Sequence, residues 1–194
     1  MFFTFFLLKK NPAFPTTEIC ADKYKISRKE QDDHAIESGT RATAAAAKGL
    51  LASEIAAVPG PPVRKGDPVQ VDADEALIKF DPEKLVLLRP CFRKNGGTVT
   101  AGNASPISDG AAAVVLASSA AVQKHGAKAI GRVAGYADGA HDPVHFPTAP
   151  AIAIRRAIQD AGLEPKDIDF YEINEAFSVV DLANRKLLKL NPDR

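Results

Sequence analysis

The sequence predicts an α/β protein with a layered core, because short apolar runs alternate with segments of helical spacing along much of its length. The clearest strand covers residues 168–173, which place apolar side chains on both faces, as a buried strand does. The clearest helix follows at once, with apolar residues three and four positions apart: Phe177, Val180, Ala183 and Leu187. The two elements meet at Asn174, at the end of the strand. α/β proteins often place catalytic and ligand-binding residues at strand ends.

The first half of the chain predicts one long helix and a loop-rich stretch. Ser27 and Glu30 form a capping box, from which a helix runs towards Leu51. Its inner face is expected to carry Ile36, Thr43, Ala47 and Leu50. Residues 58–68 hold four prolines and two glycines and are expected to form a loop, and residues 69–97 to be irregular, with short elements.

The second half predicts alternating strands and helices. Further strands are expected at residues 98–101, 111–117 and 130–136, with a polar turn at 103–110. A short helix over 119–125 ends at Gly126. Pro150 suits the first turn of a helix that ends at Gly162 and buries Ile154, Ile158 and Ala161.

Composition excludes several classes of protein. The 194 residues are enough for one large or two small domains, and 25 basic against 24 acidic residues do not suit a general nucleic-acid binder. Cys20 and Cys91 lie far apart, which argues against a disulfide framework or structural zinc and fits a reducing compartment.

The apolar run at residues 1–8 is too short to span a membrane. Its positive charges follow the run, whereas those of a secretory signal precede it. We expect residues 1–15 to be a poorly structured start.

Few side chains stand out as functional on spacing alone. Asn174 suits the N-cap position of the following helix, and the negative charge of Glu175 suits the positive end of the helix dipole. A cap residue that is held rigidly can also present its amide to a ligand. Residues 97–106 are mostly small, which permits close approach of a ligand or a tight turn. The four histidines have no ligand-like spacing, so each is expected in a loop or on the surface, and no metal site is expected. Neither cysteine has the context of a nucleophile.

Three stretches resemble the thiolase family. Asn174-Glu-Ala-Phe177, after an acidic and apolar strand, is similar to the N-E-A-F motif of thiolases. Leu88 to Ser105, followed by Ser108-Asp-Gly-Ala-Ala-Ala113, resembles a second family block, and Tyr24 to Asp32 a third. The resemblance covers residues 16–194. Lys79-Phe-Asp81 and His145 to Pro150 look most like the biosynthetic, acetyl-CoA acetyltransferase branch, and degradative 3-ketoacyl-CoA thiolases are the closest rival.

The resemblance implies a partial thiolase fold, layered α/β/α/β/α. It assigns residues 16–90 to part of the loop domain, 91–125 to the end of the first half and 126–194 to the start of the second half. Family members are homotetramers or homodimers, which makes a homo-oligomer the expected state of the complete form. They occur in several compartments, and we expect the cytosol here.

The resemblance also implies a reaction, the condensation of two acetyl-CoA molecules to acetoacetyl-CoA and its reversal by free CoA. The CoA thioester is the substrate and no other cofactor is implied. Asn174 matches the residue that holds a water in the oxyanion hole, where a fixed amide can orient a water dipole at the developing charge. Other positions match residues that contact the substrate in the family. Ser105 and its neighbour Ala101 match the pantetheine arm, and Ala176 and Phe177 match the pantetheine tunnel. Phe146 matches the acyl pocket, and three residues match positions near the nucleotide of CoA: Lys79, Asp81 and Lys84.

Three catalytic groups of the family have no counterpart in these 194 residues: the nucleophilic cysteine, the G-H-P histidine and the C-x-G cysteine. Without an activated thiolate and its base, the residues alone are expected to be inactive. Strands without partners would expose apolar surface and cause poor solubility or pairing with a full-length subunit. The alternatives are an incomplete acetyl-CoA acetyltransferase, a degradative thiolase fragment and a non-catalytic CoA-binding or subunit-interacting remnant.

Overall fold

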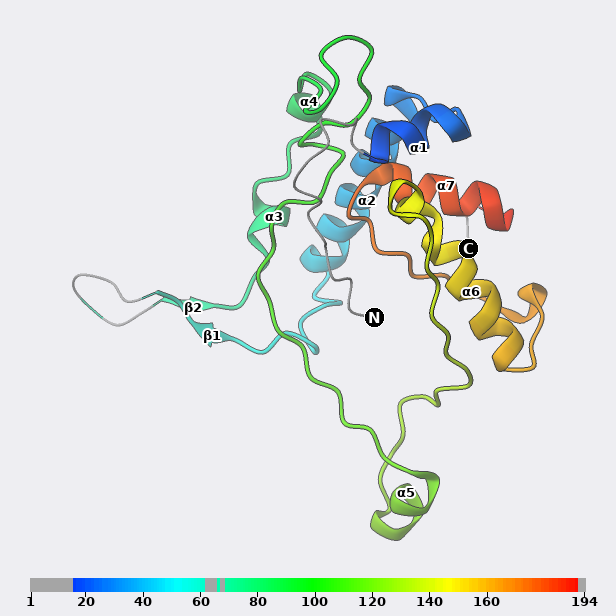
Figure 1. Cartoon of the computed structure of the whole chain (residues 1–194). Coiled ribbons are helices and arrows are strands. Elements are labelled where there is room, and N and C mark those ends of the chain that lie inside the picture. Colours follow the sequence, from blue (N-terminus) through cyan, green and yellow to red (C-terminus); the bar gives the residue numbers. More distant parts are fainter. Residues whose placement is uncertain (1–15, 62–65, 67–68, 192–194) are drawn as a thin grey trace.

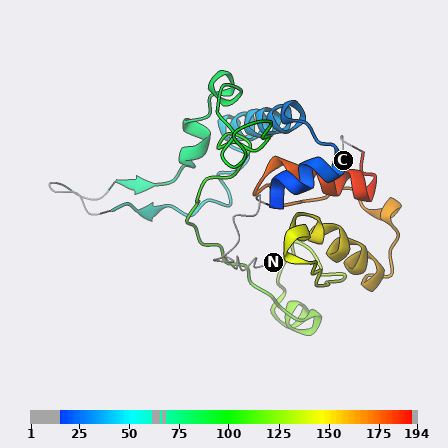
Figure 2. The same ribbon diagram turned by 45° about the horizontal axis from the view of Figure 1, so that its top comes forward.

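The computed structural model describes residues 16–61, 66 and 69–191, so the expectation of a disordered start at 1–15 lies outside the described residues. Five helices form the main cluster (Figures 1 and 2): α1 (Thr16–Tyr24), α2 (Arg28–Ala47), the 3₁₀ helix η1 (Pro143–Thr148), α6 (Ala149–Asp160) and α7 (Ser178–Leu188). Helix α1 contacts both η1 and α7, although more than 100 residues separate them in the sequence. Their shared core contains Cys20, Ala21, Ile26, Val179 and Ala183.

The other elements are short. Strands β1 (Val58–Pro59) and β2 (Gln70–Val71) form an antiparallel hairpin, in which Val58 pairs with Val71. This hairpin projects from the molecule in Figure 1. The short helices are α3 (Glu75–Ile78), α4 (Pro82–Leu85), α5 (Ser119–His125) and the 3₁₀ helix η2 (Pro165–Asp167). Helix α5 lies away from the cluster, at the end of two long extended segments (Figure 1).

Helix α2 begins where the capping box predicts. The Ser27 backbone N–H donates to Glu30 Oε2 at 2.7 Å, and Glu30 N–H donates to Ser27 Oγ at 3.1 Å. The predicted inner face is wrong, because Thr43, Ala47 and Leu50 are exposed. The buried face is polar instead and consists of Gln31, Asp32 and His34. Helix α2 is therefore held through hydrogen bonds and ion pairs rather than an apolar stripe.

Helices α5 and α6 match their predicted ends. Gly126 and Gly162 have φ angles of 58° and 68°, the left-handed conformation that ends a helix. The buried face of α6 differs from the expectation, since it carries Ala149, Ala151 and Ala153 while Ile154 and Ile158 are only half-buried. A Cβ on Gly139 would lie 2.7 Å from Ala149 O, so small residues on both sides permit this close contact.

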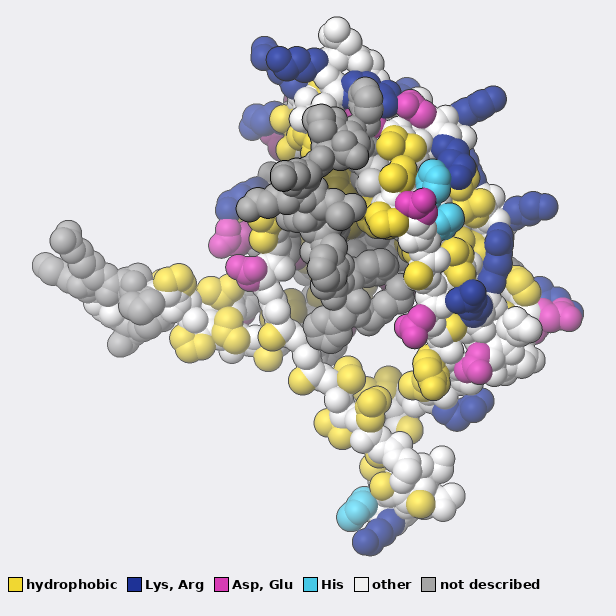
Figure 3. Space-filling model, viewed as in Figure 1, with side chains coloured by type: hydrophobic (Ala, Val, Ile, Leu, Met, Phe, Trp, Pro, Cys, Tyr) yellow, Lys and Arg dark blue, Asp and Glu magenta, His cyan; other side chains and the backbone are white. Residues whose placement is uncertain are grey.

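The four predicted strands do not form a sheet among the described residues. Thr100 makes a single bridge to Pro90, and the segments 111–117, 130–136 and 168–173 are extended without a paired strand. Several of their apolar side chains are exposed to solvent: Val114, Val115, Leu116, Ile130, Val133 and Phe170. Figure 3 shows hydrophobic side chains along the segments that lead to α5. A strand needs a neighbour to satisfy its backbone, and these segments find none here.

Candidate functional site

The loop that carries Ser105 is anchored by a buried carboxylate on α1. Glu18 is fully buried and accepts hydrogen bonds from the Thr98 N–H at 2.9 Å and the Val99 N–H at 3.1 Å. The Thr98 hydroxyl donates to the same carboxylate at 2.8 Å. Hydrogen bonds to a charged acceptor are stronger than neutral ones, so Glu18 fixes the start of the loop.

Asn103 fixes the middle of the loop. Its side-chain oxygen accepts from the Thr100 N–H at 2.9 Å, and its amide nitrogen donates to Asp32 Oδ1 on α2 at 2.8 Å and to Thr98 O at 3.0 Å. Asp32 is paired in turn with Arg28, at 2.6 Å. The loop over residues 98–105 is thus tied to both α1 and α2.

This loop pairs with the Asn-Glu-Ala-Phe segment and brings five predicted site residues into one region. The Ser105 N–H donates to Ala176 O at 2.9 Å, and the Ser178 N–H donates to Asn103 O at 2.9 Å, on either side of an antiparallel bridge between Ala104 and Phe177. Five predicted residues therefore lie on two paired segments: Ala101, Ser105, Asn174, Ala176 and Phe177. Asn174 itself is exposed.

Asn174 is not the cap of α7, which corrects the prediction. The helix begins at Ser178, and Phe177 is its N-cap. The hydrogen bonds of Ala176 and Ser178 to the loop hold residues 176 and 177 out of the helix, so tertiary pairing overrides the local capping preference. The Asn174 amide consequently belongs to an extended segment.

Phe146 lies on η1, which contacts α1 and α7. It is half-buried, and the residues after it are held by the buried Asn184 of α7. The Asn184 side chain accepts from the Ala151 N–H and donates to Pro147 O, both at 2.8 Å. These bonds supply a cap for α6, whose own N-cap Thr148 makes no side-chain cap bond.

Lys79, Asp81 and Lys84 lie around α3 and α4. Asp81 is the N-cap of α4 and accepts from the Lys84 N–H at 3.1 Å, while Lys84 Nζ lies 2.7 Å from its other oxygen. The bond from Lys84 holds the pKa of Asp81 below its usual value. Lys79 pairs with Glu75. Both lysines are exposed and paired with carboxylates, for which an incoming phosphate would have to compete.

The sequence did not predict a partly buried cluster of charged and polar side chains at the junction of α2 and α7. His34 was expected in a loop or on the surface, but it is a helical residue with a side chain 6% exposed. Its Nε2 lies 3.5 Å from Glu175 Oε1 and 3.4 Å from Asp181 Oδ2, and Arg185 Nε lies 2.6 Å from the same Asp181 oxygen. We call His34, Glu175, Asp181 and Arg185 the α2–α7 cluster.

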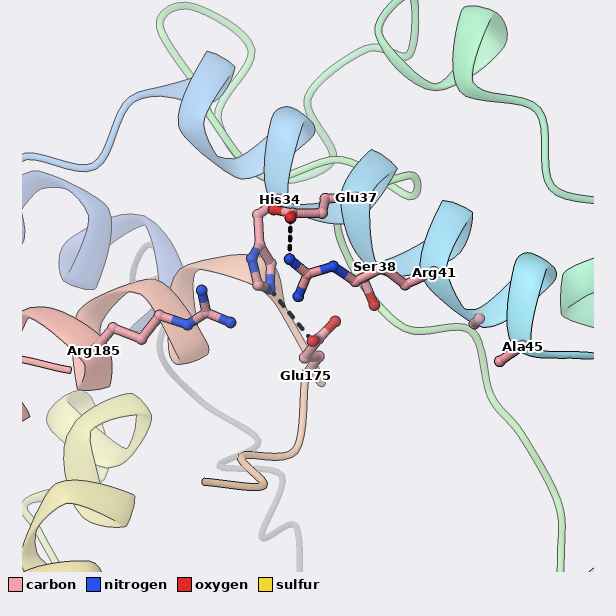
Figure 4. A pocket seen from close by; sticks show the side chains of 8 residues that line it. His34, Glu37, Ser38, Arg41, Ala45, Glu175 and Arg185 are labelled. Atoms are coloured by element: carbon pink, nitrogen blue, oxygen red, sulfur yellow. Dashed lines mark hydrogen bonds and ion pairs between the residues drawn. The ribbon is translucent and has the colours of Figure 1, made fainter. Parts of the chain in front are cut away.

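The cluster has mixed electrostatics. The nearby His34 holds the pKa of Glu175 below its usual value, whereas burial raises the pKa of Asp181 despite the nearby Arg185. The cluster opens into a pocket of about 320 Å³, whose lining also includes Glu37, Ser38 and Arg41 (Figure 4). Among the described residues, His34, Glu175 and Asp181 are the one group whose ligand atoms lie close enough to hold a metal ion.

Cys20 is poorly placed to act as a nucleophile. Cys20 is part of the apolar core, and burial raises its pKa to about 11, so the thiolate is scarce at neutral pH. Cys91 is exposed and binds Val99 O through its backbone N–H.

No helix among the described residues is both long and apolar enough to cross a membrane.

Comparison with known proteins identifies the family of this chain. The model of the thiolase N-terminal domain matches residues 7–120, and that of the thiolase C-terminal domain matches residues 127–194. Acetyl-CoA acetyltransferase 1 of Arabidopsis thaliana is 54% identical over 177 residues, which are 91% of this chain and 43% of the relative. The mitochondrial acetyl-CoA acetyltransferase of Bos taurus is 44% identical over 178 residues, 91% of this chain and 42% of the relative.

The likeness extends to a solved structure. The crystal structure of the Bacillus anthracis acetyl-CoA acetyltransferase superposes with a TM-score of 0.86 and 37% identity, over 92% of this chain and 45% of that one. The chain thus spans less than half the length of the relatives it matches. This agreement confirms the predicted partial α/β thiolase fold, and the chain belongs to the thiolase family.

Proposed function

We propose that this chain carries part of the machinery of an acetyl-CoA C-acetyltransferase, which condenses two acetyl-CoA molecules and cleaves acetoacetyl-CoA with free CoA. The observation that carries the proposal is the antiparallel pairing of Ser105 with Ala176. It joins the segment with the predicted pantetheine residue to the segment with Asn174. The names of the relatives support the same reaction.

Within this function Asn174 positions a water that donates to the thioester oxygen as negative charge develops there. An amide held in place before the reaction stabilises this charge without reorganisation during the step. Ala101, Ser105, Ala176 and Phe177 contact the pantetheine arm, and Phe146 limits the acyl pocket. Lys79 and Lys84 meet the phosphates of CoA, with Asp81 orienting Lys84.

The nucleophile is not among these residues. Acyl transfer needs a thiolate with a base in reach, and the buried Cys20, with its raised pKa, does not meet that need. The 194 residues alone are therefore proposed to be inactive in thiolysis, while contributing substrate contacts and the oxyanion amide to a complete active site.

The test is a chimera in which residues 16–191 replace the matching segment of the Arabidopsis relative. We expect the chimera to cleave acetoacetyl-CoA and the 194-residue chain to give no turnover. Asn174→Ala in the chimera should lower kcat by roughly 100-fold with little change in KM, since the water acts on the transition state. Asn95→Ala, at an exposed turn outside both paired segments, is the matched amide control.

Two outcomes would contradict the proposal. One is a chimera that unfolds cooperatively but has no thiolase activity. The other is turnover by the 194-residue chain that disappears in Cys20→Ser or Cys91→Ser. Comparison of acetoacetyl-CoA with longer 3-ketoacyl-CoA substrates in the chimera separates the biosynthetic from the degradative activity.

The remaining assignments follow from the same proposal. Acetyl-CoA and acetoacetyl-CoA are the proposed ligands, with no separate cofactor, no nucleic acid and no membrane partner. A homo-oligomer, tetramer or dimer, is the proposed state of the complete form. The names of the relatives include cytosolic and mitochondrial proteins, and we propose the cytosol.

A further inference from the structure

The α2–α7 cluster contains a buried imidazole nitrogen without a hydrogen-bond partner among the described residues. His34 Nε2 is buried and faces two carboxylate oxygens, but neither contact meets hydrogen-bond geometry. Figure 4 shows the His34 ring directed towards Glu175, with Arg185 approaching from α7. Burying a polar atom unpaired is costly, so this arrangement calls for a ligand.

The distances match those around a small tetrahedral ion. Two ligand atoms bound at about 2.0–2.1 Å to tetrahedral zinc lie about 3.4 Å apart. His34 Nε2 lies 3.4 Å from Asp181 Oδ2 and 3.5 Å from Glu175 Oε1. The three ligand atoms all lie within 4.8 Å of one another. Glu175 has a side chain 40% exposed, which gives its carboxylate room to close the remaining gap.

We propose that His34, Glu175 and Asp181 bind one divalent cation of the zinc class. A set of one imidazole and two carboxylates suits borderline metals, whereas Mg²⁺ and Ca²⁺ prefer larger all-oxygen sets. The fourth position would face the pocket lined by Ser38 and be filled by a water. The ion thereby links α2, α7 and the residue next to Asn174.

Arg185 remains compatible with a bound cation. A carboxylate has about four lone-pair sites, so Asp181 can accept from Arg185 and still ligate a metal. Arg185 then acts as an outer partner that orients the ligating carboxylate, a common arrangement around metal ligands. With both carboxylates ionised and Arg185 protonated, the site has a net charge of minus one before the cation binds.

The spacing of histidines along the chain predicted no metal site, and the fold accounts for the difference. His34 comes from α2, Glu175 from the segment before α7, and Asp181 from α7. No short sequence pattern could join them.

The experiment is a titration of the 194-residue chain with Co²⁺, followed by displacement with Zn²⁺. We expect one equivalent of Co²⁺ with the intense visible absorption of a four-coordinate site. Glu175→Gln and His34→Gln should each weaken binding by more than about 100-fold, which exceeds the tenfold to 100-fold effects of outer partners. At a free Zn²⁺ concentration of 100 times Kd, the folded-to-unfolded ratio of the unaltered chain should rise about 100-fold.

The controls use histidines elsewhere. His125→Gln, on the exposed α5, should leave the affinity unchanged. His141 and His145 meet edge to face with ring centroids 5.4 Å apart and are the rival metal-binding pair, tested by His141→Gln. Glu175 is partly exposed, so Glu175→Gln is expected to fold. It therefore still tests the proposal if His34→Gln does not fold. The proposal is overturned if no tetrahedral Co²⁺ spectrum forms, or if His141→Gln abolishes binding while Glu175→Gln does not.

Discussion

At the scale of single residues, buried charge organises this molecule as much as apolar packing does. Glu18 lies on α1 with no exposed surface, yet it accepts hydrogen bonds from three donor groups of Thr98 and Val99. A buried carboxylate is tolerated when its partners satisfy it. Glu18 satisfies that condition and sets the position of the whole loop over residues 98–105.

Removal of this carboxylate should be costly. Glu18→Ala leaves the Thr98 and Val99 N–H groups without their acceptor, and we expect the free energy of unfolding to fall by about 3 kcal/mol. Glu18→Gln keeps one acceptor oxygen and should cost about half as much. Urea-induced unfolding followed by circular dichroism measures both. The exposed Glu54→Ala is the matched control, with an expected change within about 0.5 kcal/mol. Equal effects of Glu18→Ala and Glu54→Ala would contradict the anchoring role.

At the scale of elements, the start of α2 makes stability depend on pH. The backbone and side-chain hydrogen bonds of Ser27 hold the pKa of Glu30 below its usual value, and Lys186 adds to the effect. A group whose pKa is lower in the folded state adds stability above its unfolded pKa. That contribution disappears as the pH falls through the folded value.

Glu30→Ala should therefore destabilise the protein by about 1 kcal/mol at neutral pH. The difference from the unaltered chain should shrink as the pH falls below the normal carboxyl range. Urea midpoints for the two proteins at a series of pH values test this, with Glu54→Ala as the reference for an exposed glutamate. A difference that stays constant into acid would rule out the capping-box origin.

The elements that could be predicted from sequence are those whose signals are local. Ser27 with Glu30, Pro150, Gly126 and Gly162 each specify a helix end through nearby backbone groups, and the structure confirms each of them. Strands depend on a partner elsewhere in the chain, so the apolar run over 111–117 could not reveal whether it would be paired.

The same limit applies to the site. The family motif located Asn174 and Ser105, and their segments are paired in the structure. The position of Asn174 before the helix was wrong, because hydrogen bonds to a loop 70 residues earlier displace the helix start. His34 was missed for a similar reason, since its carboxylate neighbours come from the other end of the chain.

At the scale of the whole molecule, the contrast between a helical cluster and exposed extended segments governs solution behaviour. Val115 and Ile130 are fully exposed, on the two segments that flank α5. Contiguous apolar surface of this kind favours association. We expect the double variant Val115→Lys with Ile130→Lys to scatter less light at high concentration and to bind less of a hydrophobic dye. Its unfolding midpoint should not change, since neither side chain is buried.

Gln123→Lys, an exposed position on α5, controls for added positive charge. If it reduces association to the same extent as the double variant, net charge and not the apolar segments is responsible.

The bridge between Ala104 and Phe177 has a consequence for the long segment between them. Residues 106–134 leave the helical cluster and return to it, while α1, the loop over 98–105 and α7 are already held together by their own contacts. The covalent connection across this segment mainly raises the effective concentration of one part for the other. We therefore expect the chain to tolerate a break in the backbone between residues 106 and 134, before the segment that packs on α6. Two separate polypeptides, cut there, would retain every hydrogen bond that positions Ser105 against Ala176.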